Sequence, residues 1–427
     1  RSIGIWKMGL SIPASEPKHR RHRQEGCEAD DDGAESPAIA ALYLYGDVLE
    51  SVVERVPAPD LAAAAGVSRE WLRAVRSALR RRPRRLPWLV VHLHGRRRRT
   101  AAYDPHSGAW LTVQAPRHAT PSHVRLVRGA RGDRVCALSC SGLDVAGDPL
   151  GTSACVAMKA PGVWRVDPVL AAVGDRVVAL GGACQLALAE GEDAAAVEVH
   201  EGGNWTACDP MPPALRESAA ATWLSVAATD HRVYLADRTS GCASWFDPSM
   251  RRWGPTRRLK PDAGVSTWGV APGRAGAEQL VLFGAKREGE GAKNKVVIQA
   301  WEVDGDTLDL SPGAAHHAMP SEMSARLFPH DEDEEDDGET FPSIGVCGNA
   351  TGGYVYNSAE PANGAVLYEL QQEGTAGGAV ERWEWVPCAP SVRAEPLGRV
   401  ILACSPVGLN ELELSRGLPP LGPQRAF

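Results

Sequence analysis

The chain has 427 residues, of which 44% are hydrophobic and 13 are Trp, so most of it is expected to be globular and its length predicts more than one domain. Its formal net charge of −7 is small for this length and gives no general argument for a nucleic-acid or membrane partner. No apolar run approaches the length of a transmembrane helix.

The number and spacing of the cysteines indicate the cellular compartment of the protein. The 10 Cys lie at irregular spacings, and no signal peptide is recognisable in the sequence. We therefore expect reduced thiols in a cytoplasmic or nuclear protein. The sequence begins with Arg1 rather than Met, which is expected if the natural N-terminus is missing or the gene model is imperfect.

Residues 1–37 predict a disordered N-terminal tail, because they are highly charged and contain little to bury. A basic cluster at residues 18–23 has two interpretations. It is a nuclear import signal or, as we favour, part of a solvated tail.

Residues 38–86 predict a module of three short helices, the first of which carries an apolar stripe. Asp47 is expected to cap this helix, and Pro57 and Pro59 are expected to stop it. The members of the stripe recur at helical spacing and are Val48, Leu49, Val52, Val53 and Val56.

The second and third helices complete this module. Asp60, Leu61 and an alanine run predict the second helix, and Ser68 is expected to cap the third. The residues that share one face of the third helix are Trp71, Leu72, Val75 and Leu79. Three helices in so few residues bury little apolar surface, so we expect the module to need a partner.

From Trp88 onward the sequence predicts short strands, and one segment occurs twice. An aromatic residue, Asp-Pro and a Trp seven residues after the aromatic occur from Tyr103 to Trp110 and again from Phe246 to Trp253. Each copy predicts a hairpin: the aromatic residue ends one strand, Asp-Pro starts the turn, and Trp anchors the return strand.

A second repeat gives the period. Gly-Asp-Arg-Val at residues 132–135 recurs at 174–177 and, as Asp-His-Arg-Val, at 230–233; the Asp residues of these segments, at 133, 175 and 230, are 42 and 55 residues apart. Such steps are typical of four-stranded propeller blades. The Trp residues expected to anchor strands after Trp110 are Trp164, Trp205, Trp253, Trp301 and Trp383 with Trp385.

Residues 88–414 therefore predict a mainly β fold, a β-propeller of about six four-stranded blades preceded by the helical module. Residues 399–403 are expected to pair with the first blade and close the ring, which removes an exposed sheet edge. An acidic insertion at residues 329–340, predicted to be disordered, blurs the last period and leaves seven blades as an alternative.

In this order the features resemble the plant F-box/kelch-repeat proteins. The F-box resemblance runs from residues 45–53 through 67–71. The kelch resemblance covers residues 88–414 and rests on Gly181-Gly182 and the two aromatic-Asp-Pro…Trp hairpins. One F-box directly before a propeller is more specific than either motif alone. At Tyr45-Gly46 the chain departs from the Leu-Pro with which many F-boxes begin.

The resemblance implies the substrate-recognition subunit of an SCF-type ubiquitin ligase. Its F-box would dock on the adaptor and thereby the cullin, and its propeller would hold a protein substrate. The apolar stripe independently predicts a hydrophobic partner surface, although packing within the module is the alternative. The residues assigned to adaptor binding are Tyr45, Gly46, Val48, Leu49, Val52, Val53, Val56, Pro57, Leu61 and Trp71.

Candidate chemical sites have structural interpretations that we favour. Cys136 and Cys140 lack further ligands at zinc spacing and are expected to be buried thiols. His92 and His94 share a strand face and are expected to pack there. The acidic run at 331–337 lacks the ligand order of a calcium loop, and the arginines at 96–99 lack interleaved aromatics. We expect no catalytic residue, metal, cofactor, nucleic acid or membrane partner.

Two alternatives to the receptor stay open: a kelch-propeller oxidase resembling galactose oxidase, and a non-degradative kelch scaffold. If the chain is a receptor, its residues 163–168 and 217–226 resemble those of the subgroup linked to flavonoid enzymes. Receptors of similar layout send phenylpropanoid and flavonoid enzymes, such as phenylalanine ammonia-lyase or chalcone synthase, to degradation. The substrate-binding residues are not predicted.

Overall fold

The computed structural model describes residues 46–81, 86–94, 98–113, 124–187, 193–259, 261–274, 278–289, 295–311, 317–329, 342–370 and 380–415. The chain divides into two compact units between Leu44 and Tyr45, and the first unit lies outside the described residues. The predicted tail, Tyr45 and the acidic run at 331–337 also lie outside them.

Three helices open the described chain: α1 (Gly46–Val53), α2 (Ala58–Ala65) and α3 (Arg69–Arg81). Both α1 and α2 pack against α3. The predicted cap of the third helix is confirmed, because the Trp71 backbone N–H donates to Ser68 Oγ at 3.2 Å. The predicted cap of the first is wrong, since Asp47 lies inside the first turn of α1. No described helix is long and apolar enough to cross a membrane.

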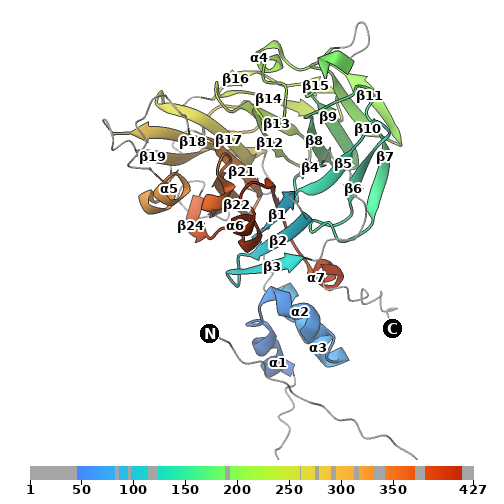
Figure 1. Ribbon diagram of the computed structural model, residues 1–427, viewed down its shortest axis with the longest axis vertical. Helices are drawn as coiled ribbons and strands as arrows, with labels where there is room; N and C mark the ends of the chain where they lie inside the picture. Colours follow the sequence, from blue (N-terminus) through green and yellow to red (C-terminus); the bar gives the residue numbers. More distant parts are fainter. Residues whose placement is uncertain are drawn as a thin grey trace, which may run out of the picture. The chain divides into compact units, whose positions relative to one another are not determined.

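The strands form six blades, which Figure 1 shows in chain order around a common centre. The innermost strands are β25 (Arg399–Ser405), β4 (Val124–Gly129), β8 (Val169–Val173), β12 (Leu224–Ala228), β17 (Val265–Pro272) and β21 (Ile344–Asn349). The second strands are β1 (Trp88–His94), β5 (Arg134–Leu138), β9 (Arg176–Leu180), β13 (Val233–Asp237), β18 (Gln279–Glu288) and β22 (Gly352–Asn357).

Two further strands complete each blade. The third strands are β2 (Arg98–Asp104), β6 (Gly142–Ala146), β10 (Val197–Glu201), β14 (Cys242–Asp247), β19 (Lys295–Asp304) and β23 (Ala365–Leu370). The outer strands are β3 (Ala109–Val113), β7 (Cys155–Lys159), β11 (Asn204–Cys208), β15 (Arg252–Trp253) with β16 (Arg257–Arg258), β20 (His317–Ala318) and β24 (Val380–Val386).

The innermost strands form a closed ring. Around it β4 contacts β8, β8 contacts β12, β12 contacts β17, β17 contacts β21, β21 contacts β25, and β25 contacts β4. The pairing of β4 with β8 is parallel and joins two blades into one eight-stranded sheet. Among the described strands this circuit closes with six blades, as predicted, and not with the seven of the alternative.

The predicted closure of the ring is confirmed. Strand β25, from the end of the chain, pairs antiparallel with β1, placing Val90 opposite Ala403 and Val91 opposite Leu402. Because β1 is the second strand of its blade, β25 supplies the innermost strand that the N-terminal part of the chain lacks. Without it the first blade would end in an open edge.

Both predicted hairpins are confirmed. Tyr103 lies directly opposite Trp110 with ring centroids 5.4 Å apart, and Phe246 lies opposite Trp253 at 5.2 Å. Each Trp also joins two blades. Trp110 Nε1 donates to the Pro387 carbonyl at 3.1 Å and Trp253 Nε1 to the Asp209 carbonyl at 3.1 Å, in each case on the preceding blade. The repeated Trp therefore links neighbouring outer strands.

Short helices lie in the connections: η1 (Gln185–Ala187), α4 (Pro213–Arg216), α5 (Ser321–Leu327), η3 (Pro361–Asn363) and α6 (Pro390–Ala394). After the last strand comes α7 (Leu409–Ser415), a helix that the sequence pattern did not predict. It packs against α2, and its Leu412 is buried. Part of the apolar surface of the helical module is thus covered by the same chain.

Candidate functional site

Of the residues predicted to bind an adaptor, some are buried in the helical module and others are accessible to a partner. Leu49 and Val53 are each 1% exposed and Leu61 is 2% exposed, so these side chains form the core of the helical module. The members with exposed or partly exposed surface are Gly46, Val48, Val52, Val56, Pro57 and Trp71. Internal packing therefore accounts for two of the five members of the stripe, and Val48, at 59% exposed, is the member of the stripe most accessible to a partner.

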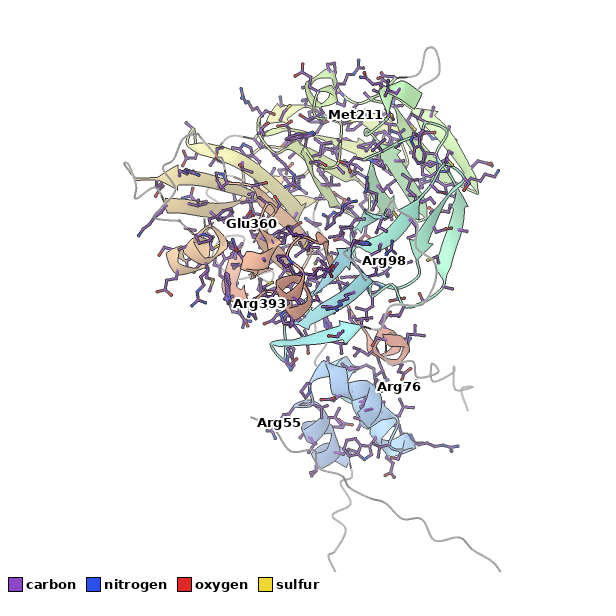
Figure 2. The ribbon with its side chains drawn as sticks, in the orientation of Figure 1. Arg55, Arg76, Arg98, Met211, Glu360 and Arg393 are labelled. Carbon is purple, nitrogen blue, oxygen red and sulfur yellow. The ribbon has the colours of Figure 1, made fainter. Side chains whose placement is uncertain are left out.

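The outside of the module also carries arginines. Arg55, just after α1, and Arg76, on α3, are exposed and lie on the outside of the helices (Figure 2). Arg69 and Arg73 precede Arg76 at helical spacing and are exposed as well. Helix α3 is therefore apolar toward α1 and α2 and basic toward solvent.

A cavity opens at the centre of the propeller. It has a volume of about 190 Å³, and its lining contains four arginines, Arg125, Arg128, Arg238 and Arg399, with Asp167. We call it the arginine funnel. Strand β4 contributes two of these arginines, β25 begins with the third, and the fourth follows β13 directly. These segments are far apart in the sequence and meet because the innermost strands surround one axis.

Two of the funnel arginines are paired. Arg128 Nη1 lies 2.6 Å from Asp133 Oδ2. Burial alone would lower the pKa of Arg128, but the Asp133 carboxylate outweighs burial and raises it. Arg125 Nε lies 3.3 Å from Asp167 Oδ1. Asp167 Oδ2 also accepts hydrogen bonds from Thr222, at 2.8 Å from its backbone N–H and 2.6 Å from its hydroxyl.

The other two arginines form no ion pair within the described part of the chain. Arg238 Nη1 donates to the Ile344 carbonyl at 2.6 Å, while its Nε is buried without a hydrogen-bond partner there. Burial lowers the pKa of Arg238, against an opposing effect of Tyr356, and nearby Arg128 lowers it further. Burial and then Arg125 lower the pKa of Arg399, and Asp167 acts in the opposite direction. The funnel therefore carries an excess of positive charge.

The loops around the funnel are fixed by a buried ion pair. Arg165 is 1% exposed, and its Nη2 lies 2.9 Å from Glu198 Oε2. Glu198 also accepts a hydrogen bond from the Gly162 backbone N–H at 2.7 Å. These contacts hold residues 162–167, and the Ala221 N–H donates to the Asp167 carbonyl at 3.0 Å. Residues 163–168 and 217–226 thus lie side by side at the funnel.

The double glycine makes this approach possible. Gly181 and Gly182 have φ of +58° and +63°, in the left-handed region. A Cβ on Gly182 would collide with the backbone of Asp167, and one on Gly181 with the backbone of Ala219. The glycines therefore let β9 end directly beneath both loops.

Three exposed apolar residues lie next to funnel residues along the chain. Val166 is 46%, Trp223 58% and Leu397 100% exposed, and each lies within two residues of a funnel residue, Asp167, Thr222 or Arg399. We call these three the apolar rim. Accessible large apolar groups beside a charged cavity are typical of a protein-binding surface.

Strand register places the funnel away from the helical module's connection to the propeller. Strand β1, which follows the helices, begins at Trp88 opposite Ser405 and ends at His94 opposite Arg399. The chain therefore enters the first blade at the end opposite to Arg399. The funnel lies on the propeller face that the incoming chain does not occupy.

The candidate metal ligands have structural surroundings. His92 is buried and its Nδ1 lies 3.2 Å from Thr100 Oγ1 on the neighbouring strand, as expected for strand packing. Cys136 is buried as predicted, but Cys140 is exposed, so that half of the prediction is wrong. In the described residues no group of three or more His, Cys, Asp or Glu is placed to hold a metal ion. The described tyrosines are buried in the blade cores.

The funnel was not predicted from the sequence. Its arginines belong to no local motif, since β4 carries two of them, β25 begins with one, and one follows the end of β13. The sequence offered only an indirect signal for the funnel. A charged residue at the start of an innermost strand must face either the central axis of the propeller or the solvent at the opening of the funnel.

Comparison with known proteins gives one curated relative. An F-box/kelch-repeat protein of Arabidopsis thaliana is 30% identical over 383 residues, covering 87% of this chain and 91% of the relative. No family model matches.

Two solved structures give weaker likenesses. Kuenenia stuttgartiensis hydrazine synthase has a TM-score of 0.35 at 10% identity, covering 68% of this chain and 80% of that one. A putative 6-phosphogluconolactonase from Bacteroides fragilis has a TM-score of 0.35 at 12% identity, covering 71% and 96%. Scores at this level carry no functional inference.

Proposed function

The chain belongs to the F-box/kelch-repeat protein family, and on this premise we propose that it is the substrate-receptor subunit of an SCF-type cullin–RING ubiquitin ligase. The helical module docks on the adaptor of the ligase. The propeller binds a protein that is then ubiquitinated and degraded by the proteasome. The receptor itself performs no chemistry.

One observation carries this proposal: a small helical module with an exposed valine precedes a closed propeller whose funnel lies on the far face. Such a chain has two surfaces for two partners. A protein held at the funnel is kept at high effective concentration near the ubiquitin-charged enzyme, and this proximity accounts for the function without a catalytic residue.

The target we propose is an enzyme of phenylpropanoid or flavonoid biosynthesis, such as chalcone synthase. Residues 163–168 and 217–226 support this proposal, because the segments that resemble the flavonoid-linked receptors are the ones that line the funnel. The receptor would then act where such enzymes are found, in the cytoplasm, with the nucleus as a second compartment.

The adaptor contact is tested with Val48→Asp in the full chain. Val48 is 59% exposed, so a carboxylate there leaves the core of the module intact but places a charge in any apolar interface. We expect co-purification of adaptor and cullin to fall about tenfold or more, which corresponds to about 1.4 kcal/mol. Leu49→Asp is a poor probe, because Leu49 is buried and its loss would unfold the helices.

Val156→Asp is the matched control. Val156 is 61% exposed on β7, within the propeller, and its substitution should leave adaptor binding unchanged. The half-life of the target in cells gives the second readout: Val48→Asp should lengthen it and Val156→Asp should not. Undiminished adaptor binding by Val48→Asp, with the partly exposed α1 valine Val52 also replaced by Asp, would refute docking through this helix.

A further inference from the structure

The arginine funnel is lined by more positive than negative side chains. Four guanidinium groups line it, and Asp167 is the one carboxylate among its lining residues. Asp133 forms an ion pair with Arg128, and Asp167 forms an ion pair with Arg125. Arg238 and Arg399 remain without an ion pair in the described part of the chain, and a buried donor of Arg238 is unused there. A buried unmet donor favours an acceptor that arrives from outside.

The size of the funnel limits the ligand. Its volume of about 190 Å³ is below the range of roughly 300–1,000 Å³ typical of pockets for drug-sized ligands, so a whole nucleotide or cofactor does not fit. One or two carboxylate side chains do fit. Guanidinium groups bind carboxylates through paired, charge-assisted hydrogen bonds.

The apolar rim adds a second requirement. Trp223 and Leu397 are exposed and lie within two residues of the funnel residues Thr222 and Arg399, and aromatic anchors together with arginines are typical of protein-binding hot spots. A ligand that satisfies both features carries acidic residues next to an apolar one. Nucleic acid is the weaker match, because its binding sites track the backbone along an extended basic surface, and this chain has a net charge of −7.

We propose that the funnel is the degron-binding site of the receptor, and that it takes an acidic peptide segment of the target protein. Carboxylates of that segment pair with Arg238 and Arg399, and an adjacent apolar side chain packs on Trp223. This inference rests on the proposed receptor function and specifies its substrate class.

The test uses the full chain, co-expressed with the adaptor and purified through a tag on the chain, and a fluorescein-labelled peptide with four consecutive glutamates followed by two leucines. The control peptide has glutamines in place of the glutamates. In anisotropy titrations we expect the acidic peptide to bind at least about tenfold more tightly, corresponding to about 1.4 kcal/mol. This preference should weaken as salt is raised, because Arg399 is exposed to screening.

Variants locate the site. Arg399→Gln should weaken acidic-peptide binding about tenfold and leave the glutamine peptide unchanged, while Trp223→Ala should weaken both peptides. The matched controls are Arg252→Gln, an exposed arginine on the outer strand β15, and Met250→Ala, which removes a 63% exposed side chain outside the funnel. Neither control should change either affinity.

The proposal would be overturned if Arg399→Gln and Arg252→Gln weakened acidic-peptide binding equally. It would also be overturned if a single-stranded oligonucleotide bound more tightly than the acidic peptide and displaced it. The same preparations report adaptor binding. Adaptor bound without acidic-peptide binding would refute this inference and leave the receptor function standing. Acidic-peptide binding without the adaptor would refute the receptor function and leave the site standing.

Discussion

Glu198→Leu should destabilise the propeller through the charge that it leaves behind. Arg165 is 1% exposed, and Glu198 accepts hydrogen bonds from its guanidinium at 2.9 Å and from the Gly162 N–H at 2.7 Å. Removing one partner of a buried ion pair typically costs about 3–5 kcal/mol. Glu198 also holds the loop that carries Val166 and Asp167, so the variant should loosen the funnel as well.

The assay is guanidinium unfolding of the full chain followed by Trp fluorescence. Glu198→Leu should lower the free energy of unfolding by about 3–5 kcal/mol, and Arg165→Met with Glu198→Leu should recover most of that loss, because the double variant buries no uncompensated charge. Glu201→Leu, which removes a partly exposed partner of Arg176, is the control and should cost about 1 kcal/mol or less. If the double variant were no more stable than the single one, the unpaired charge would not be the cause.

Three further predictions concern the ring and its loops. Truncating the chain before β25 should give an insoluble or markedly less stable protein, since β1 loses its paired edge; a soluble product with an unchanged melting temperature would contradict this. Burial and then His94 lower the pKa of His92 from 6.5 to about 3, so the unfolded state binds a proton that the folded state excludes. Stability should therefore fall as pH drops from 6.5 toward 3, and His92→Gln should reduce that slope by about 1.4 kcal/mol per pH unit in urea titrations at each pH. Gly182→Ala should lower stability more than Gly202→Ala, because both have positive φ but only Gly182 has the Asp167 backbone against it; equal melting temperatures would refute the steric explanation.

The repeat could be predicted from the sequence because its parts are local. Tyr103 and Trp110, like Phe246 and Trp253, belong to one hairpin, so their separation along the chain fixes their pairing across it. The closing strand at residues 399–403 was predictable for a different reason. It came too late in the period to begin a blade, and a propeller cannot leave an edge open.

Local patterns failed where three-dimensional packing decides exposure. The stripe on α1 combines buried Leu49 with exposed Val48, and nothing in their adjacent positions says which side α3 covers. Cys140 shares a spacing with buried Cys136 but is exposed, because it follows the end of β5 and so lies outside the strand alternation. Helix α7 was missed, since its contact with α2 joins the two ends of the described chain.

The sequence by itself determined the repeated blades, their order and the helical module before them, because periodicity and turn chemistry act over a few residues. Only the tertiary structure decided where the charges meet. Arg125, Arg238 and Arg399 come from strands and loops far apart in the chain, and closure of the ring brings them to one mouth. Whether each guanidinium finds a carboxylate depends on that assembly, because Arg125 on β4 pairs with Asp167, which precedes β8 of the next blade.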